Sequence, residues 1–366
     1  MKRRKFLTGL ATTSAIATAA LPATSAGAEP RVLKMVTSWP KNLPGLGTSA
    51  DRLAKTITAT SGGRLQVEVY GAGELVDAFE VFDAVSAGVA DMYHSAEYYW
   101  QKKSPAFSFF TAVPFGLTAS ELNSWIYDSG GQALWDELSA GFNLKAMLCC
   151  NTGVQMGGWF NKEVSSLESY EGLRYRMPGL GGEVLRRLGA VVVNLPGGEI
   201  VPSLQSGAID ASEWVGPWND FALGMHEAAK YYYYPGFHEP GTAICLGVNK
   251  KLWEEMSDDE RNVIETSAAA ENVRSVSEFN SKNAAYLQTI IKEHGIELRK
   301  FDDSVLEAIG TISGQVLAEI GQSDPMTKRV YDSYLQFRGS AIQWSNISER
   351  GFLNARSLDY DYGASG

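Results

Sequence analysis

Side chains that can bind a small charged molecule occur in three segments of the sequence. Residues 151–160 form a polar, glycine-rich stretch directly after an apolar run, 144–150, which is typical of a buried strand. Residues 173–177 contain two arginines, and residues 209–214 contain two carboxylates. Because glycine either bends a strand or lets the backbone approach a ligand closely, we expect the three segments to meet at one small-molecule site on a hinge.

The two arginines predict a receptor for an organic acid. Arg174 and Arg176 are two residues apart on a predicted strand, so they share one face while Tyr175 points to the other. A guanidinium is a planar fork that matches a carboxylate with two parallel hydrogen bonds. The spacing alone leaves open which arginine meets the ligand.

Glu213, one of the two acidic residues of the third segment, indicates a cation. Glu213 would repel a carboxylate ligand unless a metal ion lay between them. Glu213, the side-chain carbonyl of Gln155, a backbone carbonyl and ligand oxygens would form an all-oxygen shell suited to a hard ion. The alternative is a structural Arg176–Glu213 salt bridge without a metal, because buried charges usually pair.

Aromatic residues in these segments and after an earlier predicted strand are candidates for the walls of the site. Trp159 and Trp214 lie within two of them, and Tyr98 and Tyr99 follow a predicted strand at 90–94. Loops at the carboxyl ends of strands in α/β sheets commonly contact ligands. Packing in the core is the alternative for such a cluster.

The sequence contains none of the following catalytic or cofactor-binding motifs of common enzyme classes. The four histidines are scattered, and there is no C-x-x-C, no G-x-S-x-G and no complete G-x-G-x-x-G. We therefore expect a binding protein and not an enzyme. The alternative from that other class is an enzyme acting on a carboxylic acid, with Glu213 or Asp210 as base.

The N-terminal segment indicates export, and the net charge argues against two classes of partner. Residues 1–28 combine Arg3-Arg4, a weakly apolar run and a small-residue cleavage site, which predicts a twin-arginine signal peptide and a periplasmic protein. Their removal takes away four basic residues and no acidic one, so the net charge falls from −10 to −14. Such a surface argues against nucleic acid and anionic membranes as partners.

Three cysteines exclude a disulfide framework of the kind that small exported domains need. Cys149 and Cys150 share one apolar run, and Cys245 lies in another. The odd number excludes complete pairing within the chain. Whether Cys245 pairs with Cys149 or Cys150 stays open.

Strands alternate with helices from residue 32 onward, which predicts an α/β fold. One predicted helix covers 120–140. The longest begins at the capping box Ser257-x-x-Glu260, and about 35 residues at 1.5 Å each make it about 50 Å long. We expect a two-lobed fold like that of periplasmic binding proteins: lobe 1 at 29–150 plus 240–270, lobe 2 at 151–239 plus 295–322, a lobe-spanning helix at 257–294, and a C-terminal helix and tail at 323–366.

These motifs resemble the solute-binding subunits of TRAP transporters (tripartite ATP-independent periplasmic transporters), the DctP-type family. The similarity covers essentially the whole chain after the signal peptide. It is strongest in Asn151-Thr152-Gly153-Val154-Gln155-Met156-Gly157-Gly158-Trp159-Phe160, Gly172-Leu173-Arg174-Tyr175-Arg176 and Glu213-Trp214-Val215-Gly216-Pro217. Glu97 stands where the resemblance leads us to expect glycine.

The resemblance implies a role for each residue. Arg176 would bind the ligand carboxylate, and Glu213-Trp214-Val215-Gly216-Pro217 is similar to the branch that binds 2-oxo acids such as pyruvate. In that branch the residues matching Gln155, Glu213 and the Trp214 carbonyl hold a metal ion, for which we favour sodium over calcium. Further substrate contacts are expected from Asn151, Gln155, Trp214, Tyr98, Tyr99 and Trp159.

The expected function is therefore that of a periplasmic binding protein that delivers a small 2-oxo monocarboxylate to a TRAP membrane permease. Lactate or another organic acid, bound with calcium, is the alternative within the same fold. Some members of this branch dimerise by exchanging a C-terminal helix. We expect a homodimer here, with residues 323–366 as the dimerisation element.

Overall fold

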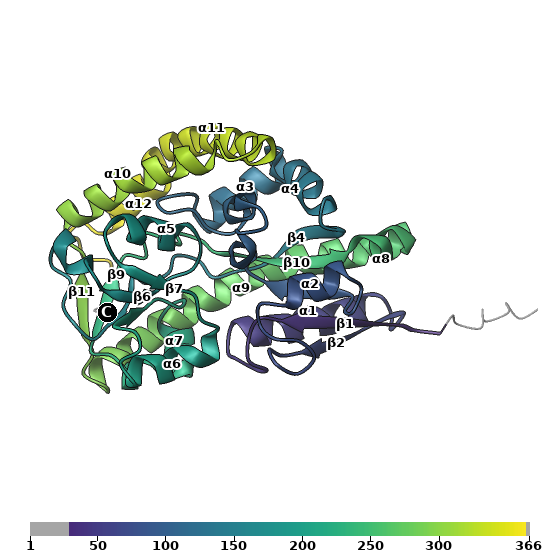
Figure 1. The fold of residues 1–366 in the computed structure, drawn as a ribbon, viewed down its shortest axis with the longest axis horizontal. Helices are drawn as coiled ribbons and strands as arrows, with labels where there is room; N and C mark the ends of the chain where they lie inside the picture. The colour runs from purple at the N-terminus through teal and green to yellow at the C-terminus, as the bar shows by residue number, and fades with distance from the viewer. Residues whose placement is uncertain (1–28, 364–366) are drawn as a thin grey trace, which may run out of the picture.

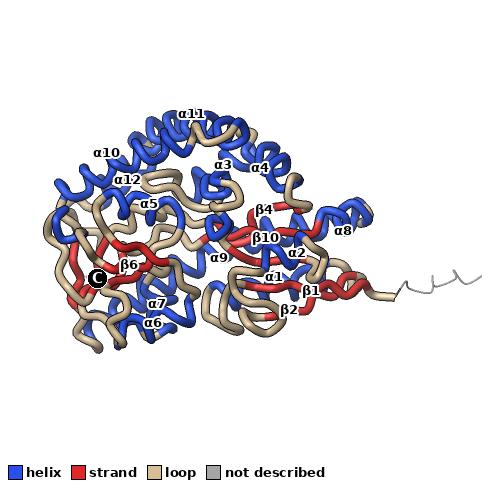
Figure 2. The backbone as a smooth tube through the Cα atoms, viewed as in Figure 1, coloured by secondary structure: helices blue, strands red, loops and turns tan. Residues whose placement is uncertain are grey.

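The computed structural model describes residues 29–363, whose strands form two separate sheets (Figure 1). The predicted signal peptide, residues 1–28, lies outside the described residues. Figure 2 shows the strands of the two sheets as two groups, with helices around each. The predicted α/β fold is confirmed, and we refer to the five-stranded sheet with its helices as the first lobe and to the six-stranded sheet with its helices as the second.

The first lobe is built on the strand order β2-β1-β3-β10-β4. β1 pairs in parallel with β2 and β3, whereas β10 runs antiparallel to both β3 and β4. Strands β10 and β4 are buried along their whole length, except for Lys145 in β4. The strands are β1 (Arg31–Thr37), β2 (Leu65–Tyr70), β3 (Met92–Ser95), β4 (Leu144–Asn151) and β10 (Ala243–Asn249).

The second lobe has the order β11-β9-β5-β8-β6-β7. Its central strands are short, because the polar and glycine-rich segments singled out in the sequence interrupt them. β6 pairs in parallel with β8, so that Arg176 lies opposite Ser212, next to Glu213. The strands are β5 (Gly158–Phe160), β6 (Arg174–Arg176), β7 (Val191–Val193), β8 (Ala211–Ser212), β9 (Tyr231–Tyr234) and β11 (Glu297–Lys300).

Helices cover both sheets (Figure 1). The α-helices are α1 (Leu46–Thr60), α2 (Val81–Ser86), α3 (Ala119–Asp128), α4 (Gly131–Ala140), α5 (Gly179–Arg187), α6 (Gly197–Gln205), α7 (Pro217–Leu223), α8 (Lys250–Glu255), α9 (Asp258–Lys292), α10 (Asp303–Ile320), α11 (Pro325–Ile347) and α12 (Glu349–Arg356). Short 3-10 turns are η1 (Glu97–Trp100), η2 (Pro105–Phe110), η3 (Leu167–Tyr170) and η4 (Met225–Glu227).

The single helix predicted over 120–140 is wrong, because the chain breaks into α3 and α4. Gly130 has φ 85°, in the left-handed region that favours glycine, and forms the N-cap of α4. A continuous apolar pattern on both sides of the break made the two helices look like one.

The long helix α9 has 35 residues, as predicted, and begins at the predicted capping box. The Ser257 hydroxyl accepts from the Glu260 amide, and the Glu260 carboxylate accepts from the Ser257 amide at 2.9 Å. The helix packs on α1 and β4 of the first lobe and on α7 of the second, so it spans the molecule (Figure 1). Arg52 of α1 anchors it through a partly buried salt bridge to Glu271, 2.6 Å long.

The C-terminal helix α11 returns the chain to the first lobe. α10 packs on α5 in the second lobe, whereas α11 packs on α3, α4 and η2. The Tyr334 hydroxyl accepts from the Leu117 amide at 2.9 Å, and Trp125 Nε1 donates to the Ser333 hydroxyl at 3.1 Å. The chain therefore passes between the lobes four times: after β4, after β9, within α9 and between α10 and α11.

The three cysteines are free and buried, which settles the question of pairing that the sequence left open. Burial raises the pKa of the Cys150 thiol to about 12, so it stays protonated. Among residues 29–363, no helix combines the length and apolar character that crossing a bilayer requires.

Candidate functional site

Arg176 is the cation at the centre of the candidate site. It is fully buried at the end of β6, and its Nη1 forms an ion pair with Glu213 Oε1. Nε donates to the Leu195 carbonyl at 3.1 Å, but Nη2 has no hydrogen-bond partner. Arg174, by contrast, is half exposed and pairs with Asp210 at 2.8 Å. Of the two arginines, Arg176 is therefore the one with an uncommitted, buried donor.

Glu213 supplies the anion. It is 0% exposed, and its Oε2 has no hydrogen-bond partner. Burial raises the pKa of Glu213 to about 7, although the Arg176 guanidinium acts in the opposite direction. An unpaired carboxylate oxygen in such a place is an acceptor directed toward something other than the protein.

Gln155 presents its carbonyl oxygen in the same way. Its Nε2 donates to the hydroxyls of Thr152 at 3.2 Å and Thr242 at 3.0 Å, which fixes the orientation of the amide. Oε1 is then left buried and without a partner. This oxygen is the one predicted for the cation shell, and the hydrogen bonds of Gln155 leave it available for that role.

One imidazole and one carboxyl group that were not predicted from the sequence lie close to Glu213. His238 and Glu239 come from the loop between β9 and β10, and their ligand atoms lie within 4.8 Å of one another and of Glu213. His238 Nε2 is 3.5 Å from Glu213 Oε2, and Thr242 donates its hydroxyl to Glu239. No local pattern in the sequence marks these two residues, because their burial and their contact with Glu213 appear only in the folded chain.

Backbone contacts hold this loop against the Gln155 segment. The Gly236 amide donates to the Gln155 carbonyl at 3.0 Å, and the Gln155 amide donates to the Glu239 carbonyl at 3.1 Å. A Cβ on Gly236 would lie 2.4 Å from the Gln155 carbonyl oxygen. Only glycine allows the two segments to approach so closely.

Aromatic rings from both lobes cover Arg176. The Trp214 ring lies 5.2 Å from the guanidinium carbon, a cation–π distance, and Trp214 packs edge-on against Trp39 of the first lobe at 6.2 Å. Tyr98 and Tyr99 approach from η1. Burial raises the pKa of Tyr99 to about 12, and the neighbouring Arg176 charge partly offsets this. The structure thus brings together Arg176, Glu213, Gln155, Trp214, Tyr98 and Tyr99.

Asn151 and Trp159 have partners of their own. Asn151 Nδ2 donates to the Gly241 carbonyl at 3.1 Å, and its Oδ1 accepts from the Gly153 amide at 2.9 Å. Trp159 stacks on Tyr232 and donates Nε1 to Asp220 at 2.8 Å. Because these polar groups are used inside the protein, we propose that both residues support the site and do not contact the ligand.

Asp220 connects this support to the segment that follows Glu213. Its Oδ2 accepts from Trp159 and from the Tyr232 hydroxyl, and its Oδ1 accepts from the Val215 and Gly216 amides, each at 3.0 Å. Four donors therefore converge on one buried carboxylate. This arrangement fixes the backbone next to Trp214. The carbonyl of Trp214 is one of the predicted ligands of the cation.

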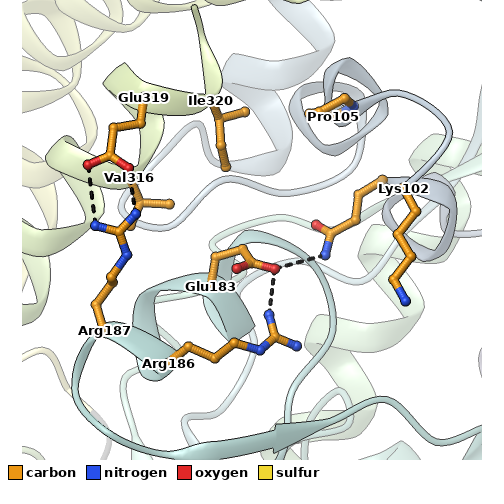
Figure 3. Close-up of a pocket in the computed structure, with 9 residues that line it drawn as sticks. Lys102, Pro105, Glu183, Arg186, Arg187, Val316, Glu319 and Ile320 are labelled. Carbon is orange, nitrogen blue, oxygen red and sulfur yellow. Dashed lines mark hydrogen bonds and ion pairs between the residues drawn. The ribbon is translucent and has the colours of Figure 1, made fainter. Parts of the chain in front are cut away.

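A separate pocket of about 360 Å³ lies between α5, α10 and the residues after η1 (Figure 3). Its arginines are paired, Arg186 with Glu183 and Arg187 with Glu319. Gln101 of the first lobe donates to Glu183 of the second at 3.4 Å. The pocket thus lies across a contact between the lobes and has no buried unpaired charge like those around Arg176.

Two lobes that meet over a buried cluster of charges define a solute-binding protein. The family model DctP, described as "Bacterial extracellular solute-binding protein, family 7", matches residues 35–324, and the chain belongs to this family. The predicted family and function as a TRAP solute-binding protein are confirmed. Its relatives are periplasmic or extracytoplasmic binding proteins.

Named relatives match almost the whole chain. A monocarboxylate 2-oxoacid-binding periplasmic protein of Nostoc sp. is 38% identical over 98% of this chain and 99% of its own length. A TRAP solute-binding protein of Bordetella bronchiseptica, a mixed-occupancy dimer with calcium and picolinate, has TM-score 0.88 and 34% identity over 89% and 97% of the two chains. One from Pseudoalteromonas atlantica, with sodium and pyruvate, has TM-score 0.87 and 33% identity over 90% and 100%.

Glu97, just before Tyr98, is a buried carboxyl group of the first lobe that should make the stability of the protein depend on pH. Its carboxylate is buried and accepts from the Tyr93 hydroxyl at 2.5 Å and from Trp135 Nε1 at 2.7 Å. Burial raises its pKa from 4.5 to about 7. Between these pH values the folded protein keeps a proton that the unfolded chain has released, so this group lowers stability as the pH rises.

The unfolding free energy of Glu97→Gln should therefore decrease less than that of the wild type between pH 4.5 and 7. Above pH 7 the variant should be the more stable of the two proteins. Each unit of pKa shift is worth about 1.4 kcal/mol. Urea unfolding across this range measures the difference, with the exposed Glu293→Gln as control. Parallel curves for wild type and Glu97→Gln would contradict the assignment.

Proposed function

We propose that this protein captures a small 2-oxo monocarboxylate such as pyruvate together with a metal ion, in the periplasm, and delivers it unchanged to a TRAP membrane permease. The observation that carries the proposal is the set of three buried polar atoms without partners: Arg176 Nη2, Gln155 Oε1 and Glu213 Oε2. One is a donor and two are acceptors. A carboxylate together with a cation would satisfy all three.

Arg176 would bind the carboxylate of the acid. Its Nε and Nη1 are already used by the Leu195 carbonyl and Glu213, which fixes the plane of the guanidinium and leaves Nη2 for the ligand. The rings of Trp214 and Tyr99 exclude water, which strengthens the charge interaction. A site enclosed in this way suits a ligand of a few atoms.

The cation would be held by Gln155 Oε1, Glu213 Oε2 and the Trp214 carbonyl, and Glu239 lies close enough to add a further oxygen. The bound ion would offset the negative charge of the carboxylates and accept oxygens of the acid. We favour sodium over calcium. The sodium and pyruvate in the Pseudoalteromonas relative support this choice, and the calcium in the Bordetella relative supports the alternative.

Closure of the two lobes would bring these groups together. Arg176, Glu213 and Trp214 belong to the second lobe, whereas Tyr98, Tyr99 and Trp39 belong to the first. Contacts between the two sets, such as Trp39 on Trp214, would be lost if the lobes opened. Hinge closure around a ligand is the ordinary mode of action of such two-lobed proteins.

The C-terminal region supports the proposal of a homodimer. Apolar side chains at the end of α11, on α12 and in the tail are exposed, and α12 packs mainly on α11. Several large exposed apolar side chains in one region are a common mark of an interface. The most exposed of these side chains are Trp344, Ile347, Phe352, Leu358 and Tyr362.

Arg176→Lys should weaken pyruvate binding on the order of 100-fold, because lysine keeps the charge but loses the planar guanidinium, in which Leu195 and Glu213 hold two nitrogens and leave Nη2 for the ligand. Isothermal titration calorimetry measures the change. Arg174→Lys is the matched control, since the same substitution two residues away affects only the exposed pair with Asp210. An unchanged dissociation constant for Arg176→Lys would remove Arg176 from the site.

Pyruvate binding should depend on a cation and on Gln155. In chelated buffer without sodium, the thermal shift produced by pyruvate should be lost, and sodium or calcium should restore it. Gln155→Leu should raise the cation concentration needed by about tenfold or more, whereas the exposed Gln322→Leu should not. A full thermal shift without any metal ion would refute the role of the cation.

The double variant Trp344→Glu with Ile347→Glu should convert the dimer to a monomer, because it introduces charge into the apolar surface. Analytical ultracentrifugation reports the mass directly. Val273→Glu is the control, since Val273 is equally apolar and 63% exposed but lies on α9. Wild-type protein that sediments as a monomer at every concentration would disprove the dimer.

A further inference from the structure

Phe115, in the segment between η2 and α3, adopts a backbone conformation that bulky residues avoid. Its φ of 51° lies in the left-handed region, and the other two non-glycine residues with positive φ among residues 29–363 are asparagines, Asn42 and Asn143. Asparagine enters this region readily, whereas a phenylalanine there is strained. Such strain persists only where the surrounding contacts hold it in place, so the contacts of Phe115 indicate its role.

The contacts of Phe115 join the first lobe to the loop that carries His238 and Glu239. This loop, residues 235–242, leads the chain from β9 of the second lobe to β10 of the first. The Phe115 amide donates to the Phe237 carbonyl at 2.7 Å, and the two rings stack with centroids 5.8 Å apart. The Phe115 ring also packs against the apolar core of the second lobe. Phe115 is therefore fixed to the loop by backbone and side chain together.

Phe237 lies within the part of the loop that faces the candidate cation shell. Its ring packs edge-on against His238, with centroids 5.5 Å apart, and His238 and Glu239 place their ligand atoms beside Glu213. Backbone hydrogen bonds of 3.0 and 3.1 Å join the residues on both sides of Phe237 to Gln155. The position of Phe237 therefore determines where the His238 and Glu239 side chains lie relative to the other proposed ligands of the ion.

Helix α11 holds the segment around Phe115 in place. Arg338 Nε donates to the Phe115 carbonyl at 2.9 Å, and a Cβ on Gly116 would clash with the Tyr334 hydroxyl. Tyr334 and Arg338 are four residues apart, so they lie on one face of the helix. The segment is thus held between α11 on one side and the 235–242 loop on another.

We propose that Phe115, held by Arg338, is a positioning residue for the cation: through Phe237 it sets His238 and Glu239 against Glu213. This inference rests on the proposed function, since it assumes that a cation binds with the acid. Groups behind the ligands of a metal ion fix their orientation, and their loss typically lowers affinity for the ion by about 10- to 100-fold. Phe115 and Arg338 act on the ion through the loop and do not touch the acid.

Two variants remove the two contacts separately. Phe115→Gly removes the ring, and because glycine readily adopts a φ of 51°, the backbone bond to Phe237 is kept. Arg338→Met removes the donor to the Phe115 carbonyl and keeps a long, unbranched side chain. In each variant the cation concentration needed for half-maximal pyruvate affinity should rise about tenfold. At saturating cation, the pyruvate affinity should return to the wild-type value, which a general loss of structure would not allow.

Isothermal titration calorimetry with pyruvate, over a series of sodium and of calcium concentrations, measures both quantities. Arg329→Met is the matched control, since Arg329 also joins α11 to the first lobe, by a pair of 2.6 Å with Glu137 of α4. Phe115→Tyr keeps the ring and should need no more cation than the wild type. Should Phe115→Gly not fold, Arg338→Met tests the inference by itself.

Three results would overturn the inference and leave the proposed function intact. They are an unchanged cation requirement in the folded variants, a loss of pyruvate affinity that persists at saturating cation, and an equal rise in the requirement for Arg329→Met. If the wild type binds pyruvate equally well without a cation, the proposed role of the cation and this inference fail together.

Discussion

The buried ion pair between Arg176 and Glu213 is the interaction on which the rest of the structure depends. Taking two charges out of water costs several kcal/mol per ion, and the attraction between them repays this only when the remaining polar atoms are satisfied. Here they are not, because Arg176 Nη2 and Glu213 Oε2 have no partners. The buried pair is therefore an unfavourable arrangement, which the carboxylate and cation proposed above would relieve.

The surrounding elements maintain this arrangement. The parallel pairing of β6 and β8 sets Arg176 beside Glu213, Asp220 fixes the backbone after Trp214, and two threonines orient Gln155. The first lobe adds its rings to the same site, since Trp39 packs on Trp214. In the function proposed above, the ligand would favour the closed state because it contacts groups of both lobes only there.

Much of the fold was predictable, and the reasons are local. Ser257 and Glu260 determine where α9 begins whatever surrounds them, and its length followed from its apolar period. The break at Gly130 was missed because one glycine in a long helical pattern does not by itself end a helix.

In the site, the types and spacing of residues indicated an anion receptor with a cation, but only the partners of each side chain in the folded protein distinguish Arg176 from Arg174. His238 and Glu239 were missed because their role depends on contact with Glu213, which is distant in sequence.

The four passages of the chain between the lobes have a consequence for how the molecule is made. The first sheet is incomplete until β10 has joined it, and its aromatic surface at Phe109 and Trp125 stays uncovered until α11 arrives. The first lobe therefore cannot be completed before residues 325–347 have been synthesised, long after its first strands. A chain shortened before residue 325 would leave those rings exposed and prone to aggregation.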